Sequence, residues 1–184
     1  TNETDNTITL PNGNNETIAI SSSLDFYKYN LFGQISRTIA KDKLSLSVGL
    51  RTDGNTYSAK MNNPWTQLSP RFSASYKLNP QWNLNFNTGR YYQTPAYTML
   101  GYKDSNNQFI NRANNISFIQ CTHWVGGIEY SAMKNSRFTI EAFLKNYNNY
   151  PQSLRNGLSL ANAGGDFGVV GNEPVTSSSE GRAY

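Results

Sequence analysis

The sequence predicts an all-β protein, an antiparallel up-and-down meander of about six strands paired as three hairpins. Two observations lead to this prediction. Apolar and polar residues alternate with a period of two over several stretches, as in strands that have one apolar face. Short turns at 40–43, 79–81 and 132–136 also alternate with long polar stretches at 55–67, 92–115 and 148–180. Ordinary soluble β-proteins do not separate short and long connections so regularly.

Composition supports an ordered chain. The 184 residues are only 37% hydrophobic, but 13% are aromatic and 12 are Tyr. Disordered segments are depleted in aromatic residues, so we expect order over much of the length. Many Tyr residues, few charges and repeated Gly fit strands better than helices.

Charge, cysteine count and hydropathy exclude several classes of protein. The net charge is +4, but no run of Lys and Arg forms a nucleic-acid surface. The single cysteine, Cys121, allows no internal disulfide, which argues against a disulfide-stapled secreted module. No apolar stretch reaches the 18 or so residues of a membrane-spanning helix. The polar start at Thr1 is no signal peptide, so we expect a signal and further sequence upstream.

The first predicted hairpin contains the cleanest alternation in the chain. Residues 1–27 are polar and predicted to be loop, with room for a short strand near 16–21. A strand is predicted at 28–39 and the next at 44–51, where one face is wholly apolar: Leu44, Leu46, Val48 and Leu50. Pairing Ile39 with Leu44 across the turn places Ile35 opposite Val48, so apolar side chains meet throughout.

The other two hairpins follow the same pattern. Strands are predicted at 69–78 and 82–91, and then at 116–131 and 137–147. Pairing Leu78 with Trp82 matches the apolar faces of the second hairpin, and pairing Tyr130 with Phe138 matches those of the third.

The two faces of these strands indicate part of a transmembrane β-barrel. One face carries Arg, Lys, Glu, Asn, Ser and Gly, as a hydrated lumen would. Aromatic residues collect near the short turns on the apolar face, where an interfacial girdle belongs: Tyr76, Trp82, Tyr130 and Phe138. The alternative is a soluble β-sandwich at the cell surface, such as a carbohydrate-binding module, which would bury the apolar face against a second sheet.

In terms of domains, residues 1–27 are expected to be a loop of extracellular type. Residues 28–147 form the six-stranded barrel segment, with long loops at about 55–67 and 92–115. Residues 148–184 are a long loop and the start of a further strand.

Five segments, taken in order, resemble the barrel of TonB-dependent outer-membrane receptors, particularly those of Bacteroidetes. Gly-Leu-Arg-Thr-Asp at 49–53 ends a strand that enters a long loop, and Ser-Pro-Arg-Phe-Ser at 69–73 begins the next strand. Gly-Arg-Tyr-Tyr-Gln-Thr-Pro at 89–95 is similar to the family's strand exit. The other segments are 127–130 with 141–147, and Glu-Gly-Arg-Ala-Tyr at 180–184.

The resemblance implies a localisation, partners and a function. Such receptors are outer-membrane barrels of about 22 strands with an N-terminal plug. They import iron chelates, cobalamin or glycans with energy passed on by TonB. The implied partners are TonB through the plug, membrane lipid and a nutrient ligand, with a surface lipoprotein as a further candidate. These residues contain no plug or TonB box, so the chain is expected to be a barrel fragment. In isolation it should self-associate through its open strand edges.

Aromatic residues in or near the long loops are the candidate ligand contacts. Binding sites are often built from loops on a rigid scaffold, and aromatic rings with nearby amides suit a glycan or a metal chelate. Packing of loop against loop would explain the same rings. The candidates are Trp65, Tyr92, Tyr97, Tyr102, Phe109 and Tyr150.

No enzyme, metal or cofactor site is predicted. Cys121 and His123 are spaced like two metal ligands, but the chain has no other Cys or His to complete a structural zinc site. Asp104 begins only part of a calcium loop, and the glycines at 164–168 lack the other residues of a phosphate-binding loop. Glu129 and Glu141 are interpreted as wall residues because nothing supplies a matched acid and base in a cleft.

Overall fold

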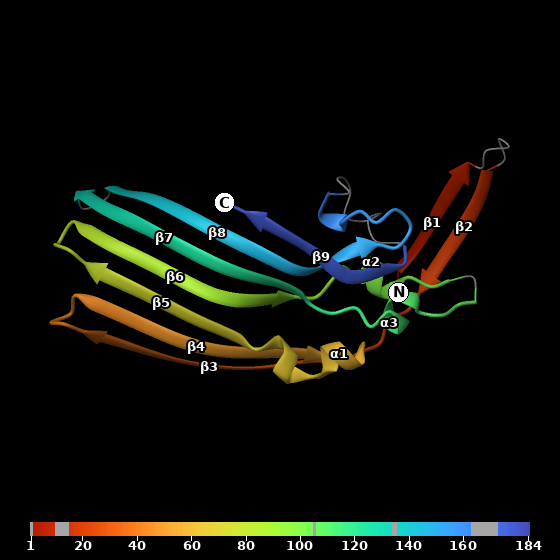
Figure 1. Cartoon of the computed structure of the whole chain (residues 1–184), viewed down its shortest axis with the longest axis horizontal. Helices are drawn as coiled ribbons and strands as arrows, with labels where there is room; N and C mark the ends of the chain where they lie inside the picture. The colour runs from red at the N-terminus through yellow and green to blue at the C-terminus, as the bar shows by residue number, and fades with distance from the viewer. Residues whose placement is uncertain (1, 10–14, 105, 134–135, 163–172) are drawn as a thin grey trace.

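The computed structural model describes residues 2–9, 15–104, 106–133, 136–162 and 173–184. Strands β3 to β9 form one antiparallel sheet in chain order, and β1 pairs with β2 in a separate two-stranded sheet (Figure 1). The elements are β1 (Asn2–Thr9), β2 (Asn15–Ser22), β3 (Lys28–Ile39), β4 (Leu44–Asn55), α1 (Ala59–Asn62), η1 (Pro64–Gln67), β5 (Ser69–Lys77), β6 (Trp82–Gln93), α2 (Tyr97–Gly101), α3 (Ile110–Ala113), β7 (Ile119–Met133), β8 (Ser136–Ser153), η2 (Leu160–Asn162) and β9 (Val175–Ala183). No helix among the described residues is long and apolar enough to cross a membrane.

The three predicted hairpins and their registers are confirmed. In the first, Ile39 pairs with Leu44 and Ile35 with Val48. In the second, the Leu78 amide donates to the carbonyl of Trp82 at 2.9 Å. In the third, Tyr130 pairs with Phe138. A slip by one residue would move every apolar side chain to the other face, so the alternation determines the register.

The structure corrects the prediction at both ends of the chain. Residues 1–27 were predicted to be loop with at most one short strand, whereas β1 and β2 pair along their whole lengths. The main sheet has seven strands: the six predicted ones and the further strand expected after residue 148, which is β9 and begins at Val175. The predicted loop from 148 is shorter than expected, because β8 continues to Ser153 and pairs with β9. The sequence Val-Thr-Ser-Ser-Ser at the start of β9 has no apolar alternation, and the stretch at 2–22 has little. These strands are defined by backbone pairing, which leaves no periodic signal.

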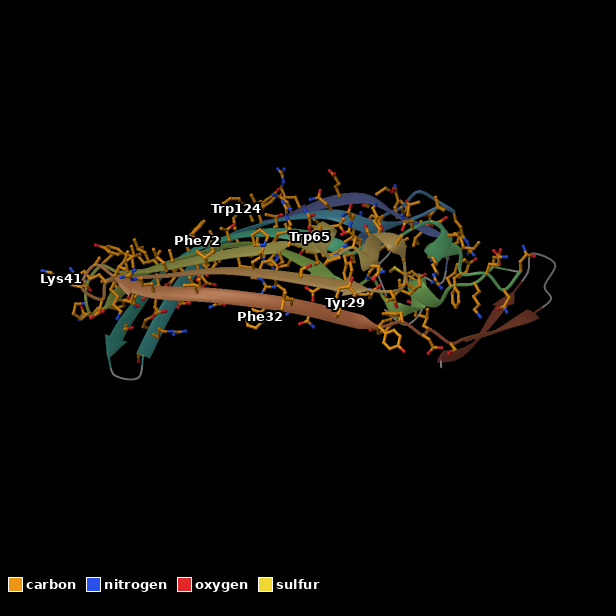
Figure 2. The ribbon with its side chains drawn as sticks, turned by 90° about the horizontal axis from the view of Figure 1, so that it is seen from below. Tyr29, Phe32, Lys41, Trp65, Phe72 and Trp124 are labelled. Atoms are coloured by element: carbon orange, nitrogen blue, oxygen red, sulfur yellow. The ribbon has the colours of Figure 1, made fainter. Side chains whose placement is uncertain are left out.

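The sheet has one apolar and one polar face, as predicted. The apolar side chains on matching register positions of β3 to β8 are here called the apolar face, and most are well exposed: Leu31, Ile35, Val48, Leu50, Tyr76, Leu84, Phe86, Trp124, Phe138 and Ile140. In Figure 2, Phe72 and Trp124 project from one side of the sheet and Phe32 from the other. Val48 is 59% and Leu50 52% exposed, so no second sheet buries this face within the described part of the chain.

Aromatic pairs sit on the apolar face close to the short turns. The rings of Trp82 and Tyr130 lie 4.5 Å apart on neighbouring strands. Tyr130 also pairs in register with Phe138, and Tyr76 lies on the same face of β5. The four aromatic residues predicted for a girdle therefore occupy one edge of the apolar face.

Hydroxyl and amide side chains interact across the polar face. Ser36 donates to Ser47 at 2.9 Å, the Thr38 and Ser45 hydroxyls lie 3.1 Å apart, and Ser75 donates to Asn85 at 2.8 Å. These cross-strand contacts stabilise the register while leaving the face hydrophilic.

The two ends of the sheet are unlike. The short connections lie at one end, marked in Figure 2 by Lys41, and the long loops with their helices gather at the other (Figure 1). The turn after β3 is tight, with φ of 56° at Ala40, 55° at Lys41 and 63° at Asp42. Part of the third predicted turn, 134–135, lies outside the described residues. The predicted loops at 55–67 and 92–115 contain α1 and η1, and α2 and α3, respectively.

Candidate functional site

The long loops share a small hydrophobic core of their own. Its buried members, here called the loop core, are Tyr57, Met61, Met99, Leu100, Ile116, Phe118, Leu160 and Val175. All but Val175, the first residue of β9, come from three separate connections, after β4, after β6 and after β8. Leu24 and Phe26, which precede β3, pack against the loop core from outside. The loops therefore form one packed body on the end of the sheet, which is the kind of rigid support that a loop-borne binding site needs.

Asn111 joins two of these loops through its side chain. The side chain is fully buried. Its Nδ2 donates to the carbonyls of Met99 at 2.8 Å and Glu173 at 2.9 Å, and its Oδ1 accepts from the amide of Val175 at 2.7 Å. Buried backbone groups need partners, and this amide side chain satisfies those of Met99 and Val175 together with the partly buried carbonyl of Glu173. The loop after β6 is thus fixed to the segment that leads into β9.

Tyr57 and Ser58 attach the first loop to the second. The Tyr57 hydroxyl donates to the carbonyl of Leu100 at 2.9 Å, and the Ser58 hydroxyl to that of Ile116 at 3.1 Å. Ser58 also caps α1 by accepting from the amide of Met61. Burial raises the pKa of Tyr57 to about 12, although the nearby positive charge of Arg112 acts in the opposite direction.

The structure separates the six predicted contact residues into exposed and packed rings. Trp65, on η1, is 76% exposed and Tyr97, at the start of α2, is 51% exposed. Tyr92 and Tyr150 instead pack against the loop core, which is the packing role that the sequence left open for them. A part in ligand binding remains a prediction for all six residues.

Three of the predicted aromatic residues have a basic side chain beside them. The ammonium group of Lys28 lies 4.8 Å from the ring centroid of Tyr97 and contacts its hydroxyl. Lys103 lies 4.8 Å from the ring of Phe109. Arg155 donates to the Tyr102 hydroxyl at 3.4 Å. The loop surface around α2 therefore offers aromatic rings with positive charge beside them.

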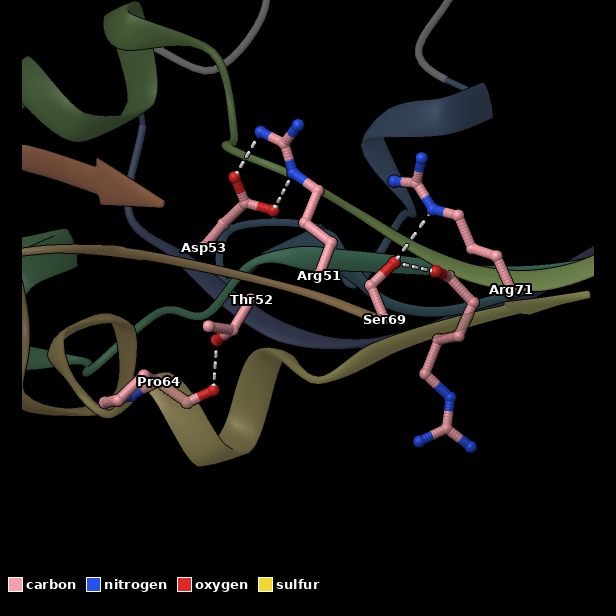
Figure 3. A network of polar contacts seen from close by, with 7 residues as sticks. Arg51, Thr52, Asp53, Pro64, Ser69 and Arg71 are labelled. Atoms are coloured by element: carbon pink, nitrogen blue, oxygen red, sulfur yellow. Dashed lines mark hydrogen bonds and ion pairs between the residues drawn. The ribbon is translucent and has the colours of Figure 1, made fainter. Parts of the chain in front are cut away.

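A polar network ties the strand ends to the loops (Figure 3). Arg51 makes two hydrogen bonds to Asp53, at 2.8 and 2.6 Å, and the Thr52 hydroxyl donates to the carbonyl of Pro64 at 2.5 Å. The Ser69 hydroxyl donates to the carbonyl of Arg90. Three of the segments singled out in the sequence, 49–53, 69–73 and 89–95, thus meet on adjacent strands, where they stabilise the ends of β4, β5 and β6.

Other candidate chemistry has structural partners of its own. Asp104 accepts hydrogen bonds from the amides of Asn106 and Gln108, so its carboxylate shapes the local turn. Glu129 lies 3.7 Å from Arg137 on the neighbouring strand. Among the described residues, no three His, Cys, Asp or Glu side chains gather as metal ligands do. The glycines at 164–168 lie outside the described residues.

The role of Asn111 and the contacts among the loops are not evident from the sequence. Asn111 is one of many Asn residues in a polar stretch, and nothing local marks it as buried. The arrangement of Arg71, His123 and Lys145 on the polar face was also missed, because it depends on pairing across several strands.

Comparison with known proteins places the chain in a family. A family model described as TonB dependent receptor-like, beta-barrel, matches residues 1–181. No curated protein and no solved structure matches. This family comprises receptors and transporters of the outer membrane and is not a family of enzymes. With nearly its whole length matched, and with an antiparallel sheet of one apolar and one polar face, the chain belongs to the TonB dependent receptor-like β-barrel family.

Proposed function

We propose that this chain forms part of the wall of an outer-membrane receptor that actively imports a nutrient. The observation that carries the proposal is the exposed apolar face of β3 to β8, backed by a face of Ser, Asn, Arg and Lys. In a barrel the first face meets lipid and the second meets the hydrated lumen. The match to the receptor family supports the same conclusion.

The nutrient is an iron chelate, cobalamin or a glycan, and it is received by the loop end. The packed loop core supports this proposal, because α2, which carries the exposed Tyr97, contributes Met99 and Leu100 to it. The exposed Trp65 lies on η1 of the neighbouring loop. The order of the strand-end segments favours a receptor of the Bacteroidetes type. TonB acts through a plug segment of the complete receptor, and a surface lipoprotein is a further candidate partner at the loops.

Neighbouring strands of the same barrel cover the two edges of the sheet. Among the described strands, β3 and β9 each have a single partner in this sheet. A lipid-exposed edge would leave backbone groups without hydrogen bonds, which the hydrocarbon core does not tolerate. Produced alone, the 184-residue chain should therefore self-associate. Light scattering would show this, and a stable monomer would contradict it.

A soluble β-sandwich that binds carbohydrate is the second candidate. It requires a second sheet over Leu44, Leu46, Val48 and Leu50. In the described residues the only other sheet is the β1–β2 pair, and Val48 and Leu50 remain more than half exposed. The exposed face favours the barrel wall.

The proposal is tested with the gene of the full-length protein. A deletion strain should grow more slowly when its iron chelate, cobalamin or glycan supply is limiting, and a plasmid copy should restore growth only when TonB is active. Trp65→Ala and Tyr97→Ala should weaken uptake, whereas Tyr76→Ala on the apolar face serves as a matched aromatic control. Recovery of the full-length protein in the soluble fraction, or equal growth on every nutrient, would refute the proposal.

A further inference from the structure

A row of basic side chains crosses the polar face of the sheet. In the strand register, Gly49 pairs with Arg71, Arg71 with Gly89, Gly89 with His123 and His123 with Lys145. These five positions form one line over β4 to β8. The three with side chains all carry nitrogen donors, and the glycines leave gaps beside Arg71 and His123.

The gap at Gly89 is filled by Tyr91, whose ring fixes the position of Arg71. The Arg71 guanidinium carbon lies 4.6 Å from the Tyr91 ring centroid, and the same ring lies 4.6 Å from that of His123 at an interplanar angle of 36°. A Cβ on Gly89 would come within 3.1 Å of Tyr91 and 3.2 Å of Arg71. A larger residue at this position would push the Tyr91 and Arg71 side chains by a few tenths of an ångström. The stack holds the guanidinium in one orientation before any ligand arrives.

The row has no matching acidic row. Within the described part of the chain, the ion pairs are Arg51 with Asp53 and Arg137 with Glu129, and neither includes Arg71 or Lys145. Arg71 donates one long hydrogen bond from Nε, 3.4 Å to the Ser69 hydroxyl, and its two Nη groups bond to no described residue. On β8 the nearest carboxylate, Glu141, is four residues from Lys145, or about 13 Å along the strand.

We propose that Arg71, His123 and Lys145 form a binding site for a small solute that carries carboxylate or phosphate groups. The planar guanidinium suits two parallel hydrogen bonds to such a group. Lys145 lies three strands away, roughly 14 Å at the usual strand spacing, and long side chains from both sides shorten that span. The site rests on the proposed function in one respect, namely that the polar face lines a path open to solutes.

The test uses the purified full-length receptor in detergent at low ionic strength, with glutarate as the probe and its neutral diamide as the control ligand. Calorimetry should detect glutarate binding and no diamide binding. Arg71→Gln and Lys145→Gln should each weaken glutarate binding about tenfold, the loss expected for one charged hydrogen-bonding partner. The matched control is Arg90→Gln, because Arg90 occupies the position next to Gly89 and belongs to the opposite face; this variant should bind like the parent.

Two results would overturn the inference. One is no glutarate binding by the parent receptor, as expected if a carboxylate from elsewhere in the protein already covers the row. The other is an equal loss of glutarate affinity in Arg71→Gln and Arg90→Gln, which would indicate unspecific attraction of the anion to positive charge. Arg71→Lys keeps the charge and loses the planar fork. Circular dichroism of this variant shows whether a loss of binding could come from misfolding. TonB-dependent uptake of the nutrient without glutarate binding would refute the binding site alone and leave the proposed function intact.

Discussion

Removing the Asn111 side chain should loosen the loops without disturbing the sheet. In Asn111→Ala, the carbonyls of Met99 and Glu173 and the amide of Val175 each lose a partner. Met99 and Val175 are buried, at 6% and 0% exposure, so water does not readily replace the lost hydrogen bonds there. Each buried group left unpaired costs about 1 to 3 kcal/mol. The free energy required to open the packed loops, here called the loop body, should therefore fall by about 3 kcal/mol.

Hydrogen exchange followed by mass spectrometry measures this loss on the full-length receptor. About 3 kcal/mol corresponds to roughly a hundredfold faster exchange in the segments around Met99 and Val175, with unchanged protection in β4 to β6. Asn111→Asp should behave similarly, because a carboxylate would face two carbonyls without a donor. Asn106→Ala is the matched control, since Asn106 is an exposed residue of the same loop. Exchange in Asn111→Ala within threefold of the parent would refute the assigned role.

Three further predictions concern other parts of the molecule. Gly54→Ala should lower the thermal midpoint by several degrees, because the new Cβ would overlap the ring of Tyr29 and overpacking costs about 1 to 3 kcal/mol. The loop body should lose stability as pH rises from 10 to 12: the pKa of Tyr57 is raised from 10.0 to about 12, so the tyrosine ionises first in the opened state. Val48→Lys should make the free energy of folding into the membrane less favourable by about 2 to 4 kcal/mol, since it places a charge on the face proposed to meet lipid.

Each of these predictions has a control and an outcome against it. Gly33→Ala has open space around its Cβ, and an equal loss of thermal midpoint there would exclude a specific clash at Gly54. Tyr57→Phe should flatten the alkaline loss seen by hydrogen exchange, and an unchanged pH profile would assign that loss to other groups. Ser47→Lys belongs to the polar face, and an assembly defect as large as that of Val48→Lys would contradict the assigned faces.

The sheet was largely predictable from sequence because the alternation of apolar and polar side chains determines its register. Apolar residues such as Leu44, Leu46 and Val48 recur at every second position of a strand, and a one-residue slip would reverse their faces. Alternation gives no signal for the Ser run that begins β9, although Ser178 donates to the side chain of Gln152 on β8, and it gives none for the pair β1 and β2. The alternation of apolar and polar residues predicts only those strands that have one apolar and one polar face.

The loops were beyond sequence reasoning for a different reason. Their short helices contain four or five residues each, too few to show a helical period. The contacts of Asn111 join residues more than sixty positions apart, and a single sequence holds no trace of that pairing. Of the predicted aromatic residues, Tyr92 and Tyr150 lie on strands β6 and β8. Whether a ring such as Tyr150 faces a ligand or the loop core depends on these distant contacts.

The pairing of each strand with its chain neighbour has a kinetic consequence. Strand β4 can close on β3 across a few residues, and no later strand has to be threaded between earlier ones. The longest connection within the sheet, from Gln93 to Ile119, is roughly sixfold longer than the turn at Ala40, which adds roughly 1.5 kcal/mol of closure entropy. The wall can therefore assemble as a succession of zipping steps from either end, with small entropic barriers, and a strand made late need not wait for the whole chain to find its place.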